Sequence, residues 1–384
     1  MDPERSARRR HADVVVIGGG IIGCSAAAIM ADRGARVVLV EGSAIGAGAS
    51  GRNLGAIQHP FDPALAPLYH ESLTRYRALA DASGGTFAVG ALPAGLLLLN
   101  PDPQAAARQV PRFRSVDPAL APELLDPEQV VALEPSLAHG PSGVRLQTGF
   151  PIPPASATEA WADLAEERGA VLLVGVPGRV VIEDGRATGV ALDDGDVVVA
   201  DAVLVAAGPW TPRIVDPTGA WRPIVPTYGV TIQLRMDGAA PRHVVEEDAV
   251  DSINRSQPAQ TAADVDPPSL FSIASAAGIS TLGSTFLTAE PDPGPIETLL
   301  LRRAAAFLPA IADAEIVGRR MCARPQSLDG RPFIGAVAGS AGLFVCAGHG
   351  PWGISTGPAS AALAARSVLD GTPPPPELAA SRPV

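Results

Sequence analysis

The chain has 384 residues, 47% of them hydrophobic and 18% charged, so it is long enough to bury a large core and too apolar to be disordered throughout. Its 29 basic and 40 acidic residues give a net charge of −11, which argues against nucleic acid or an anionic membrane as the main partner. All 29 basic residues are arginine, so no mechanism here depends on a lysine. No apolar run is long enough to span a bilayer, and we expect a cytoplasmic protein without a membrane span.

The three cysteines, Cys24, Cys322 and Cys346, lie far apart and form no Cys-x-x-Cys pair. The sequence therefore predicts neither a metal site nor a disulfide framework. The basic run at residues 8–10 precedes an apolar strand and a glycine turn, and no small-residue cleavage site follows. This pattern is not typical of an export signal.

Residues 13–41 carry the strongest signal in the chain. An apolar run of strand length ends in Gly18-x-Gly20-x-x-Gly23, a helix-length segment follows, and a second apolar run ends in Glu41. Gly18 permits the tight turn, Gly20 lets the backbone approach a pyrophosphate, and Gly23 lets the helix pack close to the strand. The helix N-terminus faces the phosphates, and the Glu41 carboxylate is placed to accept hydrogen bonds from the adenosine ribose. The pattern predicts a dinucleotide site, and composition does not choose between NAD and FAD.

Residues 42–60 form a glycine-rich stretch that contains Ser50, Arg52 and Asn53. Such a backbone suits close contact with a flat ligand, and the alternative is a flexible loop. The position of the stretch, directly after the ribose-binding acid, favours the ligand.

Strands and helices alternate through the rest of the chain. Helical periodicity covers residues 62–83 and stops at Gly84-Gly85. The further predicted elements are a strand over 95–99, a short helix over 127–133, a helix over 155–168, strands over 171–205, strands and long loops over 226–290, and a helix over 296–308.

Four later segments, together with the N-terminal fingerprint, resemble the FAD-dependent amine and amino acid oxidoreductase family. That family includes glycine oxidase, D-amino acid oxidase and dehydrogenase, and the sarcosine oxidase group. In chain order the segments are Ala49–Asn53, Ala206–Trp210, Arg324-Pro325 with Asp329-Gly330-x-Pro332-x-x-Gly335, and Gly348-His349-Gly350. The matches occur in the family's order, which makes the resemblance specific.

The resemblance implies an α/β fold in which a Rossmann-type FAD-binding domain is interleaved with a substrate domain built on an antiparallel sheet. The expected FAD-binding domain comprises residues 12–60, 151–225 and 318–371. The expected substrate domain comprises 61–150 and 226–317, and the termini, 1–11 and 372–384, are expected to be flexible.

The chemistry implied by the resemblance is oxidation of an amine, either an amino acid or an N-substituted amino acid. FAD would stay on the enzyme and accept a hydride at N5 from a C–H bond beside nitrogen, giving an imine and, with oxygen as the acceptor, hydrogen peroxide. Two alternatives stay open. One is a dehydrogenase that passes electrons to a quinone or a protein carrier, and the other is a flavoprotein subunit of a larger complex.

The resemblance places Arg324 where the family binds the substrate carboxylate, because a guanidinium makes two parallel charge-assisted hydrogen bonds to a carboxylate. Tyr228, on a strand expected to border the substrate pocket, and His59, near the end of the glycine-rich stretch, are the other catalytic candidates. The residues expected to contact FAD are Gly18, Gly20, Gly23, Glu41, Ser50, Arg52, Asn53, Ala207, Gly208, Trp210, Cys322, Gly348, His349, Gly350 and Gly353.

Two positions leave the chemistry open. In the sarcosine oxidase group the cysteine matching Cys322 carries a thioether to the flavin 8α-methyl, and the alternative is a buried packing residue. That group also uses a lysine near the flavin to help oxygen accept electrons, and Thr281 stands at the matching position here. Either another cation, such as Arg52, assists oxygen, or oxygen is not the preferred acceptor.

Overall fold

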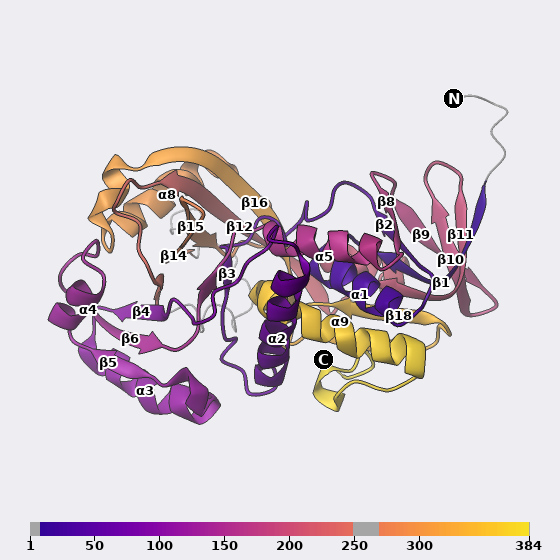
Figure 1. Cartoon of the computed structure of the whole chain (residues 1–384), viewed down its shortest axis with the longest axis horizontal. Coiled ribbons are helices and arrows are strands. Elements are labelled where there is room, and N and C mark those ends of the chain that lie inside the picture. The colour runs from indigo at the N-terminus through magenta and orange to yellow at the C-terminus, as the bar shows by residue number, and fades with distance from the viewer. Residues whose placement is uncertain (1–7, 249–268, 384) are drawn as a thin grey trace.

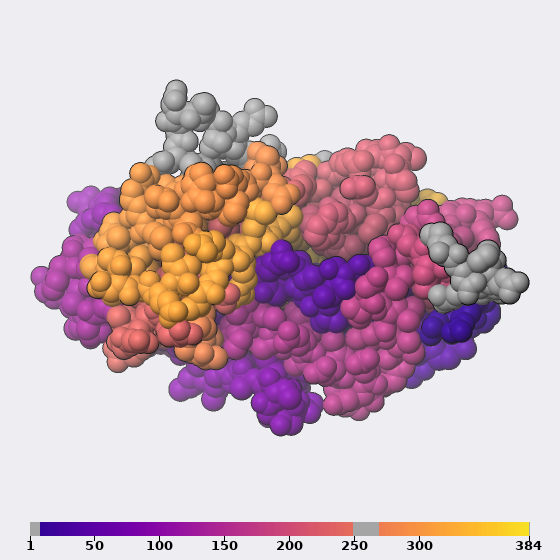
Figure 2. Space-filling view, turned by 90° about the horizontal axis from the view of Figure 1, so that it is seen from above, coloured from indigo at the N-terminus to yellow at the C-terminus, as the bar shows by residue number. Residues whose placement is uncertain are grey.

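The computed structural model describes residues 8–248 and 269–383, which form two lobes arranged along the long axis of the molecule (Figure 1). Each lobe is built on an eight-stranded sheet, and the chain crosses between the lobes several times. Figure 2 shows a patch of indigo from the N-terminal part of the chain between the orange surface of one lobe and the pink surface of the other.

The first sheet has a parallel centre, with the strand order β17-β18-β11-β1-β2-β8, and β10 and β9 extend it from β11. Its central strands are buried runs of apolar residues, as expected for parallel strands that are covered on both faces. The strands are β1 (Arg9–Ile17), β2 (Val37–Glu41), β8 (Val171–Val174), β9 (Gly178–Glu183), β10 (Arg186–Leu192), β11 (Val197–Val205), β17 (Phe333–Ala336) and β18 (Leu343–Ala347). Helix α1 (Ile21–Asp32) packs against α5 (Ser156–Glu167) and α9 (Gly353–Asp370), and α9 also packs against α2 (Ala66–Ala82). This arrangement confirms the expected Rossmann-type lobe.

The second sheet has the strand order β16-β12-β15-β14-β13-β4-β6-β5 and is antiparallel except where β13 pairs with β4. The strands are β4 (Leu96–Asn100), β5 (Glu123–Leu125), β6 (Ser142–Leu146), β12 (Ile224–Arg235), β13 (Val244–Glu247), β14 (Ser269–Ala276), β15 (Ile279–Thr285) and β16 (Glu315–Ser327). Helix α8 (Pro293–Ala305) covers this sheet with apolar residues, and α3 (Pro103–Val116) and α4 (Pro127–Leu133) lie at its far end. The expected antiparallel substrate lobe is therefore present.

A short antiparallel pair, β3 (Ala56–Ile57) with β7 (Phe150–Pro151), and the small helix α6 (Thr211–Val215) are the remaining strands and α-helix of the described residues. No helix within residues 8–248 and 269–383 is both long and apolar enough to cross a membrane.

One expected domain boundary differs from the sheet assignment. The boundary before residue 318 falls inside β16, which pairs with β12 from Ser327 back to Glu315. Backbone pairing therefore keeps the whole of β16 in the second sheet, and the chain returns to the first sheet only at β17.

The expectation that residues 372–384 are flexible is wrong for the part that the structure describes. Leu378 is buried, and the Ala380 N–H donates to the Ile334 carbonyl. Arg382 forms two hydrogen bonds with Asp329 and stacks on the Phe333 ring. The proline run that precedes these residues restricts the backbone, so ordering it costs little entropy. At the other end, β1 already begins at Arg9, and residues 1–7 lie outside the described residues.

Candidate active site

The glycine turn after β1 is packed too closely for any side chain at two positions. A Cβ on Gly23 would lie 1.8 Å from the Gly18 carbonyl oxygen, so only glycine lets α1 start this close to the strand. Gly18 has a φ of +115°, and a Cβ there would lie 2.5 Å from the Ala206 carbonyl oxygen at the end of β11. These contacts hold the N-terminus of α1 open toward a ligand.

Glu41 ends β2 beside this turn. Its carboxylate accepts hydrogen bonds from the Gly19 and Ser43 N–H groups, both at 2.7 Å. The backbone thus fixes the acid at the position that the sequence predicts for ribose binding.

The glycine-rich stretch is tied down in the structure. Asn53 donates to the Ser50 and Pro154 carbonyl groups and accepts from the Gly55 N–H. Two arginines join the stretch to β16, because Arg52 donates to the Met321 carbonyl group and Arg320 donates to the Gly51 carbonyl group. These bonds order the loop beside the cavity described next.

A cavity of about 620 Å³ lies between the lobes and takes its lining from both sheets. Most of the residues predicted to contact FAD line it. They are Gly18, Gly20, Glu41, Ser50, Arg52, Asn53, Ala207, Gly208, Trp210, Cys322, His349, Gly350 and Gly353. Arg324 also lines the cavity, whereas Gly23 and Gly348 shape the backbone behind it.

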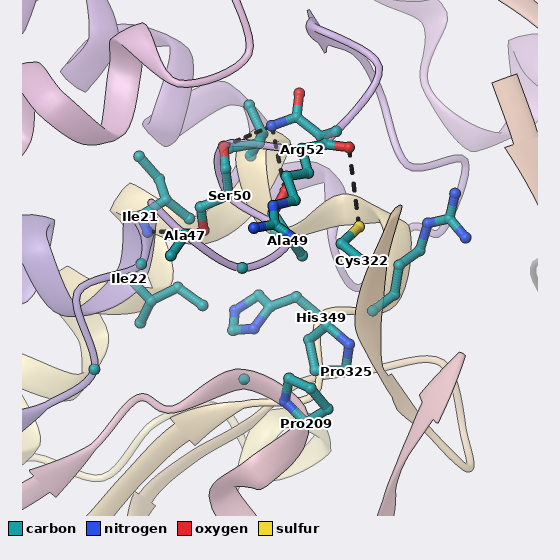
Figure 3. A pocket seen from close by; sticks show the side chains of 18 of the residues that line it. Ile21, Ile22, Ala47, Ala49, Ser50, Arg52, Pro209, Cys322, Pro325 and His349 are labelled. Atoms are coloured by element: carbon teal, nitrogen blue, oxygen red, sulfur yellow. Dashed lines mark hydrogen bonds between the residues drawn. The ribbon is translucent and has the colours of Figure 1, made fainter. Parts of the chain in front are cut away.

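His349 gives the clearest sign that the cavity is built for a polar ligand. Its ring is buried, and neither ring nitrogen has a hydrogen-bond partner among the described residues. Figure 3 shows the ring projecting into the space between Ala49 and Pro209. Burial lowers the pKa of His349 to about 3, so the neutral ring offers one donor and one acceptor. The bare glycine turn, the fixed acid and this unpaired ring fit a dinucleotide whose second ring system carries polar groups, as FAD does.

Arg324 lies on β16 and is held from three sides. It donates to the Thr285 carbonyl oxygen at 2.8 Å and to the Ser284 hydroxyl, and its Cζ lies 4.8 Å from the centre of the Phe286 ring. No carboxylate in the described part of the chain forms an ion pair with it. A desolvated guanidinium whose charge is not balanced nearby is suited to bind an anion.

Cys322 lies two residues from Arg324 on the same face of β16, and its Sγ lies 3.9 Å from the Arg52 carbonyl oxygen (Figure 3). Burial raises the pKa of the thiol, and the charges of Arg324, Arg52 and Arg320 oppose that rise. The other two cysteines are buried in the first lobe, away from the cavity lining.

Two of the three catalytic candidates do not line the cavity. Tyr228 pairs with Leu287 through two backbone hydrogen bonds. Its side chain packs against the apolar core between the second sheet and helix α8, and it is not part of the cavity lining. His59 is buried against Tyr69 and lies 3.5 Å from an Asp117 carboxylate oxygen. Its neighbour in the sequence, Gln58, lines the cavity instead.

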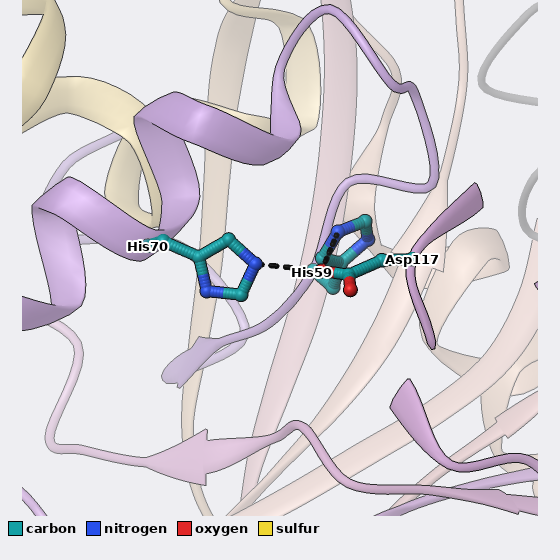
Figure 4. A group of neighbouring side chains, drawn as sticks. All are labelled: His59, His70 and Asp117. Carbon is teal, nitrogen blue, oxygen red and sulfur yellow. Dashed lines mark hydrogen bonds and ion pairs between the residues drawn. The ribbon is translucent and has the colours of Figure 1, made fainter. Parts of the chain in front are cut away.

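His59, His70 and Asp117 form a cluster that spacing in the sequence does not reveal (Figure 4). Their ligand atoms lie within 4.8 Å of one another, which would allow a metal ion. However, the His59 Nδ1 accepts a hydrogen bond from the Phe61 N–H, so the neutral ring carries its proton on Nε2, the nitrogen that faces Asp117. The His70 Nε2 is 2.6 Å from the same carboxylate oxygen. The Asp117 carboxylate is thus hydrogen-bonded to His70 and lies close to the His59 Nε2–H, an arrangement that favours a polar cluster over a metal site.

The structure adds a group of lining residues that no motif indicated. Glu246 on β13 is buried, and its only cavity-side partner among the described residues is Gln58, whose Nε2 lies 3.2 and 3.4 Å from the two carboxylate oxygens. Ser272, which pairs with Glu246 on the neighbouring strand β14, also lines the cavity. The two adjacent glutamates that end this short strand form no known motif, and only the sheet pairing shows that Glu246 lines the cavity while Glu247 does not.

Comparison with known proteins agrees with this geometry. The model of the FAD dependent oxidoreductase family matches residues 13–367. The glycine oxidase of Pseudomonas aeruginosa is 30% identical over 375 residues, covering 94% of this chain and 95% of that protein. A D-amino acid dehydrogenase of Methylobacterium sp. is 31% identical over 242 residues, covering 61% of this chain and 53% of that protein.

Solved structures show the same fold. The glycine oxidase of Geobacillus kaustophilus has a TM-score of 0.78 and 25% identity, with 98% of this chain and 100% of that chain covered. The iminodiacetate oxidase of Chelativorans sp. BNC1 has a TM-score of 0.79 and 24% identity, with 95% and 98% covered. The chain therefore belongs to the FAD dependent oxidoreductase family, and it is an enzyme that uses FAD to act on C–N bonds.

Proposed function

We propose that this enzyme is an oxidase of an amino acid or an N-substituted amino acid, with Arg324 binding the substrate carboxylate. The observation that carries the proposal is the position of Arg324, which lines the same cavity as His349 and Cys322 and has no acidic partner among the described residues. The glycine oxidase and iminodiacetate oxidase similarities support a substrate that combines an amine with a carboxylate.

FAD, when bound, supplies the acceptor for the hydride equivalent that leaves the substrate C–H bond beside nitrogen. The contribution of the chain is orientation. Ser284, Thr285 and Phe286 hold the guanidinium in one position, so the two hydrogen bonds to the substrate carboxylate also fix the direction of the amine. The amine is oxidised in its neutral form, and the imine product is hydrolysed in water.

The electron acceptor in this proposal is oxygen, with peroxide as the product. The runner-up is a dehydrogenase that uses a quinone or a protein carrier. It is supported by the D-amino acid dehydrogenase similarity and by the complete absence of lysine. Thr281 is neutral and buried on β15, so help to oxygen would have to come from an arginine such as Arg52, which lines the cavity and donates to the Met321 carbonyl oxygen.

One experiment tests the proposal and its rivals. The chain, purified alone with FAD bound, is mixed without oxygen with a panel of amino acids, N-methyl amino acids and amines that lack a carboxylate. Bleaching by carboxylate-bearing amines, followed by stoichiometric peroxide when oxygen is admitted, is the expected result. Bleaching with dye reduction but negligible peroxide would favour the dehydrogenase. A flavin that no amine bleaches would favour the role of a subunit that is inactive alone.

A further inference from the structure

The cavity has an acidic end on β13 that Arg324 does not reach. Glu246 pairs across the sheet with Ser272 on β14, and Ser272 pairs in turn with Gly283 on β15. A Cβ on Gly283 would lie 3.4 Å from the Ser272 Oγ and 3.2 Å from the Thr231 Cγ2, so these side chains share one face of the sheet. Glu246, Ser272 and Thr231 all line the cavity on this face.

The polar atoms at this end are left without enough donors. An ionised carboxylate only accepts hydrogen bonds, so Gln58 presents its amide Nε2 to Glu246 and turns its Oε1 away. The Gln58 Oε1 is buried and has no partner among the described residues. No arginine or histidine in the described ranges forms an ion pair with Glu246. A buried carboxylate beside an unpaired amide oxygen is suited to bind a cation that carries several N–H donors.

The strand order separates this end from the carboxylate-binding arginine. The Arg324 guanidinium is held on β15, and β14 and β13 follow in the sheet. Because neighbouring strands lie about 4.8 Å apart, Glu246 lies roughly 10 Å across the sheet from the strand that holds the guanidinium. An amino acid with the length of lysine or arginine spans a gap of this order when its side chain is extended.

We propose that Glu246 and Gln58 form a subsite for the cationic end of the substrate side chain, so that the enzyme prefers long basic amino acids. The inference rests on the proposed function, since it takes Arg324 as the carboxylate site. It places the two charged ends of one substrate on two oppositely charged groups, with the reacting C–H bond near the Arg324 end. Burial raises the pKa of Glu246 to about 7, and a bound cation favours its charged form.

The test compares lysine with norleucine, which keeps the chain length and removes the cation, using both enantiomers of each. Anaerobic bleaching of the FAD-loaded enzyme gives kcat/KM for each compound. In the wild-type enzyme we expect lysine to exceed norleucine by about 30-fold or more, as for a desolvated charge pair. In Glu246→Gln the lysine value falls by a similar factor, while the norleucine value stays within about threefold.

Glu247→Gln is the matched control. Glu247 is adjacent on β13 but binds Arg303 and the Phe271 N–H, and it does not line the cavity. It should keep the preference for lysine.

Several outcomes would overturn the subsite. Norleucine that matches lysine in the wild-type enzyme would overturn it and leave the proposed function intact, and this comparison does not depend on the folding of a variant. Equal losses for both compounds in Glu246→Gln would show that the carboxylate acts on the amine common to all substrates. Loss of FAD from that variant would place Glu246 against the cofactor. If no amino acid bleaches the flavin, the proposed function fails together with the subsite.

Discussion

Replacing Arg324 by alanine removes the group on which the substrate assignment depends. Loss of a buried, charge-assisted partner of a carboxylate costs roughly 2–5 kcal/mol, which corresponds to a fall in kcat/KM of about 30- to 4000-fold. Part of the effect is structural, because the Thr285 carbonyl oxygen and the Ser284 hydroxyl also lose their donor. An unpaired buried acceptor costs about 1–3 kcal/mol of unfolding free energy. The FAD content and the thermal midpoint of the variant must therefore be measured beside its kinetics.

The assay separates the two contributions by pairing each amino acid with the amine that lacks its carboxylate. If Arg324 binds the carboxylate, the variant loses activity toward the amino acid and leaves the weak reaction of the amine nearly unchanged. Arg319→Ala is the matched control, since Arg319 lies on the same strand, is exposed and pairs with Glu297. An equal loss for the amino acid and the amine would refute the assignment, because the arginine would then act on the fold or on FAD.

Three further predictions follow from single contacts. Gly229→Ala should raise KM for the amino acid and leave FAD bound, because the new Cβ would lie 2.4 Å from two guanidinium nitrogens of Arg324 and displace them. An unchanged KM would show that the guanidinium does not bind the substrate. Cys322, which lines the cavity among three arginines, should carry a thioether to the flavin 8α-methyl. Denaturing mass spectrometry should then show the mass of the chain plus one FAD, and Cys322→Ala should lose this adduct. Complete release of FAD from the denatured wild-type chain would make Cys322 a packing residue. Burial, partly opposed by Asp117, lowers the pKa of His59 from 6.5 to about 4. At a pH between these two values, His59 is therefore protonated in the unfolded chain and neutral in the folded chain. The free energy of unfolding should then decrease by roughly 3 kcal/mol as the pH drops through this range. In His59→Gln, urea titrations at several pH values should show a smaller decrease. The same dependence of the unfolding free energy on pH in the variant would exclude His59 as its cause.

The part of the cavity lining that we expect to bind FAD was predictable because its signals are local. The turn from Gly18 to Gly23, the acid at Glu41 and the segment around His349 each place glycine or a polar group directly after a strand, and the chain order of strand, turn and helix fixes their geometry. The capping box formed by Asp126 and Gln129 likewise starts α4 at the predicted residue.

The part of the cavity lining around Glu246 depends on contacts between segments that are far apart in the sequence, and no local pattern indicates such contacts. Glu246 and Gln58 are 188 positions apart and meet only because β13 lies at the edge of the cavity that β3 approaches. His59 was misplaced for a similar reason. Gln58 and His59 follow β3 in irregular chain, where the backbone of Gln58 bonds to Ser355 and that of His59 to Thr148, and the His59 ring lies in the cluster with Asp117.

The position of β16 explains how one strand can serve both the cofactor and the substrate. Its side chains alternate between two faces, so Arg320, Cys322 and Arg324 share the face that lines or borders the cavity. Arg320 fixes the glycine-rich loop, Cys322 lies with His349 in the cavity lining, and Arg324 turns toward β15. Cys322 pairs with Gly229 on β12. Because Gly229 has no side chain, the Arg324 guanidinium can lie where a Cβ on that residue would collide with it. A shift of register by a single residue would turn all three side chains to the opposite face at once, so the pairing of β16 with β12 decides whether any of them can reach the cavity.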